Sequence, residues 1–306
     1  MLFQKKFGCI VLKEESNTQQ QIELLKKQLT LAPDFQKKQI QAQIKLLKEG
    51  EIGEKNILFE LKNSGIDMYV LHDIRLVDED RSAQIDFIVI TRQIIFIIES
   101  KNLIGDIEID ENGSFIRNYE VYGKKIREGF YSPVTQNERH LQIIHDIKMK
   151  SKSNAILRLT FDHWFSDFYK PLIVLANPKN CIRNKCKDKF VSEQVIRADQ
   201  LISTIKRMNK NSKLDSYKQK DCLAIAEEFM NWDTPKPIEI PPTVEAPLPV
   251  APKLTPGISD NTTEQKICPR CGGNLILRVA KNGKYAGNRF YGCSNYPKCK
   301  YIQNEK

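Results

Sequence analysis

Runs of apolar residues separated by polar segments mark the ordered elements in the first two thirds of the chain. Three runs rich in Ile, Val and Phe predict strands from the interior of a sheet. Apolar residues at 3.6-residue spacing predict one helix before these strands and one after them, and a later apolar run predicts a fourth strand. In chain order, the predicted elements are Glu51–Asn63, Met68–Leu76, Ala83–Thr91, Ile94–Lys101, Thr135–Lys150 and Pro171–Ala176. They indicate an α/β core with the order helix, three-stranded antiparallel meander, helix, strand.

The segments on either side of this core have different patterns. Residues 15–48 are polar, with narrow apolar stripes before and after Pro33-Asp34, and predict a helical hairpin that packs on the core, self-associates or binds a protein partner. Residues 191–232 predict further helix covering the sheet. Eight of the 14 prolines lie between Pro235 and Pro256, which is typical of an extended spacer. The predicted domains are a helical hairpin (1–49), the α/β domain (50–178), a helical extension (179–233), a Pro-rich linker (234–265) and a cysteine-bearing segment (266–306).

Three charged side chains interrupt two adjacent apolar strands. Side chains alternate between the faces of a strand, so Glu99 and Lys101 share a face. A two-residue turn at Arg92-Gln93 places Asp86 opposite Glu99, although this turn lacks the Gly or Asn of a tight hairpin. Opposed carboxylates repel unless a cation lies between them, and Mg²⁺ prefers one or two carboxylates plus phosphate oxygens. An ammonium group there can orient or deprotonate a water, or stabilise charge on a phosphate.

The pattern therefore indicates a metal-dependent site for phosphodiester chemistry. The alternative is a buried ion-pair cluster of the same three residues, without catalysis. Two residues outside the hairpin are expected to join the site. Glu54 lies on the apolar stripe of the predicted 51–63 helix, where a carboxylate needs a partner or a metal. Gln136 follows Pro133, a helix start signal, and shares a helix face with His140. For Glu54 and Gln136 the alternatives are a first-turn carboxylate favoured by the helix dipole and an ordinary surface amide.

With these residues, the segment from residue 50 to about residue 150 resembles the nuclease-related domain, a branch of the PD-(D/E)xK superfamily with the restriction-endonuclease-like fold. The resemblance implies a nuclease in which Asp86 and Glu99 bind Mg²⁺ or Mn²⁺, Lys101 activates water, and Glu54 and Gln136 complete the catalytic site. It rests on Gly50, Gly53, Glu54, Gln84-Ile85-Asp86, Ile98-Glu99-Ser100-Lys101, Pro133 and Gln136.

A second motif near the C-terminus consists of two pairs of cysteines, Cys268 with Cys271 and Cys293 with Cys299. Four thiolates at such spacing can form a closed tetrahedral Zn²⁺ site, which leaves no open position for catalysis. A pair of disulfides is the alternative, although nothing else in the chain indicates an oxidising compartment. A segment of about 40 residues has too small a core to fold unaided, so zinc would supply the missing stability.

Residues 266–302 are similar to the C-terminal zinc finger of type IA DNA topoisomerases. The similarity rests on Cys-Pro-Arg-Cys-Gly-Gly and on the run from Phe290 to Cys299, and it implies binding to DNA, especially to single strands. Nine Lys and Arg residues against two Glu in residues 264–306, interleaved with aromatic residues, suit phosphates and unpaired bases. The alternative to DNA binding is a purely structural domain whose basic surface contacts only solvent. The candidate nucleic-acid-binding residues are Arg270, Arg278, Lys284, Arg289, Tyr291, Tyr296 and Lys298.

The net charge of +10 indicates a polyanionic partner. A membrane surface is not favoured, because no run approaches 18 apolar residues, and the first residues lack the apolar region and cleavage site of a signal peptide. We therefore expect a cytoplasmic protein without a membrane partner. The main functional hypothesis is a Mg²⁺-dependent nuclease that hydrolyses DNA phosphodiester bonds and is tethered to its substrate by the zinc finger. The alternatives are a non-catalytic nucleic-acid-binding adaptor and a subunit of a larger DNA-processing assembly.

Overall fold

The computed structural model describes residues 5–236, 268–279, 289–295, 297 and 299–304. They belong to two compact units, Met1–Ala246 and Pro247–Lys306, and each unit is described by itself. The predicted Pro-rich linker lies outside the described residues from residue 237 onward. Within the described part of the chain, each helix is either too short or too polar to cross a membrane.

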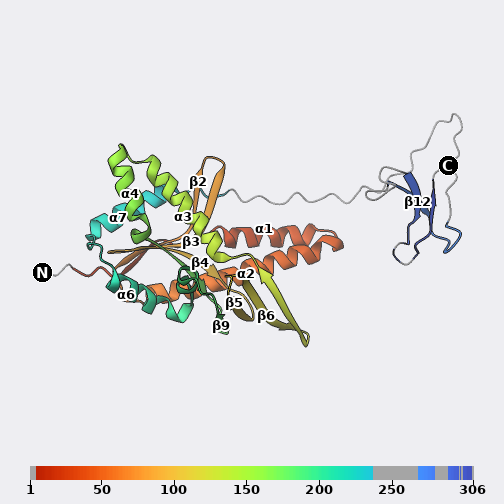
Figure 1. The fold of residues 1–306 in the computed structure, drawn as a ribbon, viewed down its shortest axis with the longest axis horizontal. Coiled ribbons are helices and arrows are strands. Elements are labelled where there is room, and N and C mark those ends of the chain that lie inside the picture. Colours follow the sequence, from red (N-terminus) through yellow and green to blue (C-terminus); the bar gives the residue numbers. More distant parts are fainter. Residues whose placement is uncertain (1–4, 237–267, 280–288, 296, 298, 305–306) are drawn as a thin grey trace. The chain divides into compact units, whose positions relative to one another are not determined.

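A mixed six-stranded sheet forms the centre of the first unit (Figure 1). Its strands, in spatial order, are β1 (Cys9–Lys13), β2 (Met68–Asp78), β3 (Arg81–Thr91), β4 (Ile95–Lys101), β8 (Tyr169–Leu175) and β10 (Val195–Arg197). The strands β2, β3 and β4 pair antiparallel, whereas β1 joins β2, β8 joins β4 and β10 joins β8 in parallel. The predicted mixed α/β class is thereby confirmed.

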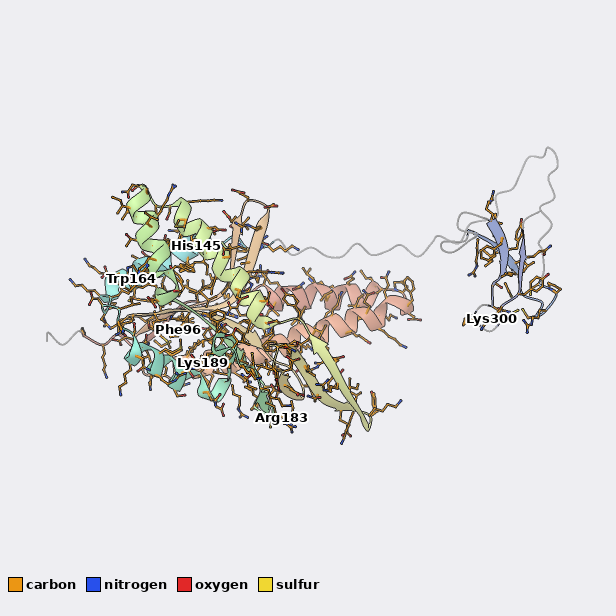
Figure 2. All side chains as sticks on the ribbon, in the orientation of Figure 1. Phe96, His145, Trp164, Arg183, Lys189 and Lys300 are labelled. Carbon is orange, nitrogen blue, oxygen red and sulfur yellow. The ribbon has the colours of Figure 1, made fainter. Side chains whose placement is uncertain are left out.

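Helices cover both faces of this sheet. On one face α2 (Asp34–Lys62) and α6 (Leu201–Asn211) pack on the sheet's apolar side chains. On the other face lie α3 (Pro133–Lys150), α4 (Ala155–Phe168) and α7 (Gln219–Trp232). Figure 2 shows Phe96 of β4 in the interior, where it is fully buried. The strands carry near-continuous apolar runs because both faces are covered.

The turn between β3 and β4 sets the register of the predicted hairpin. Phe87 pairs with Ile98 and Ile88 with Ile97, as a two-residue loop at Arg92-Gln93 requires. The side-chain oxygen of Thr91 accepts hydrogen bonds from the backbone N–H groups of Gln93 and Ile94. Neither loop residue has a positive φ. The turn therefore closes without the Gly or Asn that a primed turn needs.

The N-terminal helical hairpin differs from its prediction in two ways. Its helices are α1 (Thr18–Leu31) and α2, and α2 runs on without a break through residue 50, where a separate helix was expected. An isolated Gly costs a helix only about 1 kcal/mol, so Gly50 does not end it. In addition, the two apolar stripes pack against each other, with Ile22 and Leu25 of α1 meeting Ile40 and Ile44 of α2.

Three further differences concern segments of mixed polarity. A four-stranded sheet of β5 (Asp106–Ile109), β6 (Phe115–Val121), β7 (Lys124–Phe130) and β9 (Ile182–Asn184) was not predicted. Helix α4 and strand β1 were also missed. The segment expected to be all helix contains strand β10, which pairs with β8, after the short helix α5 (Lys189–Gln194) and before the 3₁₀ turn Ala198–Gln200. These short strands alternate polar and apolar residues too weakly to be recognised from the sequence.

The described part of the second unit is a small antiparallel sheet. Its strands are β11 (Leu275–Val279), β12 (Arg289–Cys293) and β13 (Ile302–Asn304), with β12 in the middle. Three buried cysteines, Cys268, Cys293 and Cys299, form its core together with Leu275 and Tyr301. So few apolar side chains cannot stabilise a fold alone.

Candidate active site

The candidate site lies where β3 and β4 separate. The last pair of their ladder is Phe87 with Ile98. One step further, the carboxylate of Asp86 accepts a hydrogen bond of 2.7 Å from the backbone N–H of Ser100. The side chain thus takes the place of a backbone acceptor and is held between the strands. Because the register is the predicted one, Asp86 and Glu99 meet at this fork.

Glu99, Lys101 and Gln136 form a connected polar group on the α3 side of the sheet. The Nζ atom of Lys101 lies 2.5 Å from Oε1 of Glu99 and donates a second hydrogen bond of 3.1 Å to Oε1 of Gln136. A hydrogen bond from Gln136 also reaches Glu99. Glu99 is almost fully buried, whereas the Lys101 side chain is a quarter exposed. Carboxylate, ammonium and amide therefore hold one another in place.

The first turns of α3 bring Gln136 to this position. The hydroxyl of Ser132 caps the helix by accepting from the N–H of Thr135, and Pro133 occupies the first turn. The fully buried Asn137 donates to the carbonyl oxygens of Ile97 in β4 and Leu172 in β8. This side chain fastens α3 to two strands one residue after Gln136.

Glu54 reaches the site from α2, on the other face of the sheet. Its Oε2 atom lies 3.1 Å from Nε2 of His72 in β2. Glu54 and Asp86 line one polar cavity of about 560 Å³. The remaining lining residues are Lys13, Glu15, Ser16, Asn17, Thr18, Gln20, Gln21, Asp73, Gln84, Pro235 and Lys236. The structure thus brings together all five residues predicted for the site.

The end of the first unit is fastened at the rim of this cavity. Asp233 accepts from Nζ of Lys13 at 2.6 Å and from the backbone N–H of Arg75 at 2.9 Å. The carbonyl oxygen of Lys236 accepts from the side-chain amide of Asn17. Residues 233–236 are here called the exit segment, and Pro235 and Lys236 line the same cavity as Glu54 and Asp86.

The carboxylates in the fork favour a bound cation. Burial, and then the charges of Glu99 and Glu54, raise the pKa of Asp86 well above its usual range. Burial likewise raises the pKa of Glu99, although Lys101 and Gln136 oppose the shift. The Oε2 atom of Glu99 is buried and has no hydrogen-bond partner among the described residues. An unpaired carboxylate oxygen in such a cluster is a ligand for a hard divalent cation, so the residues fit Mg²⁺ or Mn²⁺.

Two histidines beside the site were not predicted as site residues. His140, one helical turn after Gln136, places Nδ1 3.8 Å from Oε2 of Glu99. Burial and the charge of Lys101 lower the pKa of His140 to about 4, so this ring is neutral near pH 7. For His72, burial opposes protonation, but hydrogen bonds to Glu54 and to the carbonyl of Glu14 raise the pKa above the ordinary value. Sequence reasoning placed His140 on the face of Gln136 but had no signal for His72, whose partners lie 18 and 58 residues away.

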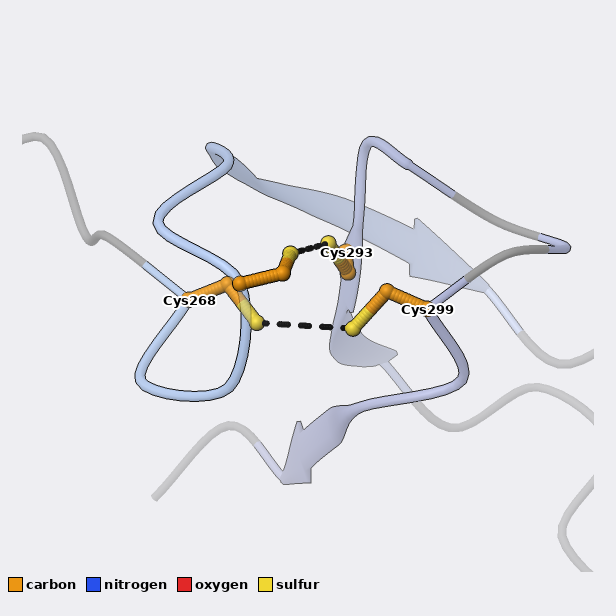
Figure 3. Close-up of side chains that lie close together, drawn as sticks. Cys268, Cys293 and Cys299 are labelled. Carbon is orange, nitrogen blue, oxygen red and sulfur yellow. Dashed lines mark hydrogen bonds between the residues drawn. The ribbon is translucent and has the colours of Figure 1, made fainter.

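The four predicted zinc ligands form a separate cluster in the second unit (Figure 3). The sulfur atoms of Cys268, Cys271, Cys293 and Cys299 all lie within 4.8 Å of one another. No cysteine of the chain forms a disulfide, and all eight are among the described residues. Four thiols converging on one point match the ligand set of a structural zinc site, and the alternative of a disulfide pair is not supported.

The candidate nucleic-acid-binding residues fall partly within the described finger. Arg270, Arg278 and Arg289 are exposed, and Tyr291 is half-buried. Arg278 pairs with Phe290 across the β11–β12 ladder, and its side chain lies against Gly292. Lys300, also described, is exposed on this unit (Figure 2). The predicted residues Lys284, Tyr296 and Lys298 lie outside the described residues.

Comparison with known protein families supports both parts of this description. One family model, described as the nuclease-related domain, matches residues 49–176, a range that contains all five residues of the candidate site. Residues 49–176 match the nuclease-related domain. Residues 265–306 match a second model, the topoisomerase DNA-binding C4 zinc finger. The nuclease-related domain and the zinc finger thus correspond to segments of the first and second unit respectively.

The curated relatives are similar over short segments only. DNA topoisomerase 1 of Methanocaldococcus jannaschii is 60% identical over 40 residues, which are 13% of this chain and 5% of that protein. DNA topoisomerase 1 of Archaeoglobus fulgidus is 44% identical over 52 residues, 16% of this chain and 7% of its own length. The uncharacterized protein YrdD of Escherichia coli is 44% identical over 36 residues, 12% of this chain and 17% of its length. No solved structure matches the chain significantly.

Proposed function

We propose that the protein is a divalent-metal-dependent nuclease that hydrolyses phosphodiester bonds in DNA. The convergence of Asp86, Glu99 and Lys101 at the β3–β4 fork carries this proposal. A protein that only binds nucleic acid has no use for a buried carboxylate, Glu99, beside a half-buried one, Asp86, because both repel phosphate. The match of residues 49–176 to the nuclease-related domain supports the same conclusion.

Asp86 and Glu99 would hold Mg²⁺ or Mn²⁺ in this reaction. A bound divalent ion lowers the pKa of water and neutralises charge on a phosphoryl group. The chain's own contribution is to keep both carboxylates fixed, Asp86 by the N–H of Ser100 and Glu99 by Lys101 and Gln136. Such fixed groups need no rearrangement as charge develops.

Lys101 would act on the attacking water or on the phosphate. Two of the three N–H donors of its ammonium group are used by Glu99 and Gln136. These two hydrogen bonds fix the direction of the third N–H group, which can donate to a water or to a phosphate oxygen. Gln136 fixes the position of this donor, and Glu54 places a further carboxylate on the α2 side of the site.

The zinc finger would bind the substrate, with single-stranded DNA as its preferred form. The topoisomerase-type finger supports DNA binding, and exposed arginines beside Tyr291 suit a strand whose bases are unpaired. Tethering raises the local concentration of DNA at the nuclease-related domain. As part of this proposal, the reaction takes place in the cytoplasm, which the free thiols of the four cysteines outside the zinc cluster support, namely Cys9, Cys181, Cys186 and Cys222.

A cleavage assay tests the proposal. The full-length protein is incubated with single-stranded, double-stranded and branched DNA and with RNA, in Mg²⁺, Mn²⁺ or EDTA. We expect metal-dependent cleavage of DNA, lost in Asp86→Ala and Lys101→Ala, while Asp215→Asn, an exposed carboxylate, remains active. Binding of DNA without cleavage of any substrate would instead identify an adaptor. Full activity in Asp86→Ala or Lys101→Ala would overturn the assigned site.

A further inference from the structure

His72 has a hydrogen-bonding environment that fixes its protonation state. Its Nδ1 atom lies 2.8 Å from the carbonyl oxygen of Glu14, and its Nε2 atom lies 3.1 Å from the carboxylate of Glu54. A carbonyl oxygen and an ionised carboxylate only accept hydrogen bonds. With Glu54 ionised, both ring nitrogens are placed to donate, and this geometry favours the imidazolium form of the ring.

The surroundings of this ring keep it in one orientation. The side chain is 8% exposed and stacks on Phe87, with ring centroids 4.7 Å apart. His72 and Phe87 are also direct partners in the β2–β3 ladder. Asp73, the next residue of β2, adds a second carboxylate that favours the protonated ring. The nearby charged groups are the carboxylates of Glu54 and Asp73, and the ammonium group of Lys13 in β1, which donates to the carbonyl of Asp73 and to Asp233.

The same ring connects two residues of the candidate site. It bonds directly to Glu54, and its stacking partner Phe87 immediately follows Asp86. The charges of Glu99 and Glu54 raise the pKa of Asp86, and the charge of Glu54 raises the pKa of Glu99, with Lys101 as the cation on the α3 side. His72 is the corresponding cation on the α2 side.

We propose that His72 is a positioning residue, an imidazolium that holds the carboxylate of Glu54 at the cavity beside Asp86 and balances part of the site's negative charge. The proposal rests on the proposed nuclease function for its kinetic consequence, but not for the charge of the ring. Partners that orient the groups of a metal site typically contribute 10- to 100-fold in activity or metal affinity. A change of that size is therefore expected when the ring is replaced.

The protonation state can be measured without any cleavage assay. The full-length protein is labelled with ¹⁵N-histidine, and the ring nitrogens are observed by NMR at about pH 7. We expect both nitrogens of His72 to be protonated, and one of them to lose its proton in Glu54→Gln. A neutral His72 in the wild-type protein would overturn the proposal, whether or not the protein cleaves DNA.

The kinetic role is measured with a double-mutant cycle. Glu54→Gln and His72→Gln are each expected to lower kcat about 10- to 100-fold with little change in KM. The double variant should be no slower than the slower single variant, because His72 acts through Glu54. Independent, multiplying effects would overturn the positioning role, and so would unchanged activity in His72→Gln. If His72→Gln fails to fold, the protonation of the His72 ring can still be measured by NMR in the near-isosteric variant Glu54→Gln.

The chain offers a matched control for this cycle. His145 in α3 also lies between two carboxylates, 3.3 Å from Asp146 and 2.9 Å from Asp162, but contacts no residue of the candidate site. His145→Gln should therefore leave kcat and KM unchanged. A loss equal to that of His72→Gln would show a general effect of removing a histidine held between carboxylates and would overturn the specific role.

Discussion

Glu99 bonds to Lys101 through one carboxylate oxygen only. The Nζ atom of Lys101 lies 2.5 Å from Oε1, whereas Oε2 is buried with Nδ1 of His140 3.8 Å away, which is too far for a hydrogen bond. The charges of Glu99 and Glu54 also raise the pKa of the neighbouring Asp86. The carboxylates at the β3–β4 fork therefore repel one another, and this repulsion has measurable consequences.

Removing the charge of Asp86 should stabilise the metal-free protein. The folded-state pKa of Asp86 is raised, so its ionised form costs stability at pH values above that pKa. Asp86→Asn should raise the thermal midpoint without metal by about 2 to 6 °C, corresponding to roughly 1 to 2 kcal/mol. Differential scanning calorimetry in EDTA measures this midpoint.

The pH dependence of the folding stability tests the direction of this effect. Without metal, the penalty at Asp86 is relieved as the pH falls through the raised folded-state pKa towards the ordinary carboxylate value near 4. Asp86→Asn should show no such relief, and Mg²⁺ should stabilise the wild type but not the variant. Asp215→Asn serves as the exposed control. An Asp86→Asn protein less stable than wild type in EDTA would refute this reading of the fork.

Two glycines of α2 should respond in opposite directions to alanine. A Cβ atom at Gly53 would lie 2.7 Å from Cβ of Asn102 and 3.1 Å from Cβ of Ala176, whereas a Cβ atom at Gly50 would meet nothing within 4 Å. Gly50→Ala should stabilise by about 0.5 to 1 kcal/mol, because Ala favours helix. Gly53→Ala should destabilise by about 1 to 3 kcal/mol, because α2 must move away from the end of β4.

Urea unfolding measures both free energies. Because Glu54 follows Gly53, cleavage activity should also fall in Gly53→Ala and stay unchanged in Gly50→Ala. Equal stabilisation of both variants would show that α2 and the residue after Lys101 are not in close contact.

Asn137 should be a large contributor to the position of α3. Asn137→Ala removes the donor to two buried strand carbonyls and should lower the free energy of unfolding by about 2 kcal/mol. Hydrogen exchange should also speed up in the first two turns of α3, which carry Gln136 and His140. Gln142→Ala, at an exposed position of the same helix, is the control. Equal stability of the two variants would contradict the anchoring role.

Zinc should stabilise the second unit alone. We expect about one Zn²⁺ per chain by elemental analysis, lost in Cys293→Ser. Chelation should abolish the dispersed NMR signals of residues 268–304 but leave the unfolding transition of residues 1–246 in place. A protein that keeps the finger signals in excess chelator would have a finger that folds without metal.

The register of the site was predictable because it depends on local features. The lengths of β3 and β4, the two-residue loop and the side-chain hydrogen bonds of Thr91 lie within a few neighbouring residues. Lys101 follows from strand alternation, and Gln136 from the helix start at Pro133. The turn at Arg92-Gln93 lacks the usual Gly or Asn, but the pairing is kept. The hydroxyl group of Thr91 closes the turn by accepting hydrogen bonds from the backbone N–H groups of Gln93 and Ile94.

The features that sequence reasoning missed depend on contacts between distant residues. His72 stands in an apolar strand, and only the fold brings Glu54 and the carbonyl of Glu14 to its two nitrogens. Strands β5, β6 and β7 contain alternating charged residues and pair with one another, and the sheet is completed by β9, a distant strand that pairs only with β5. Short polar strands of this kind have little preference of their own, and the tertiary context decides their structure.

The exit segment determines where the rest of the chain begins. Asp233 and Lys236 are fastened to Lys13 and Asn17, so whatever follows residue 236 starts at the entrance of the cavity that holds Glu54 and Asp86. The place where residue 236 ends is therefore set by β1 and the start of α1, the same two elements that line the cavity beside Glu54 and Asp86.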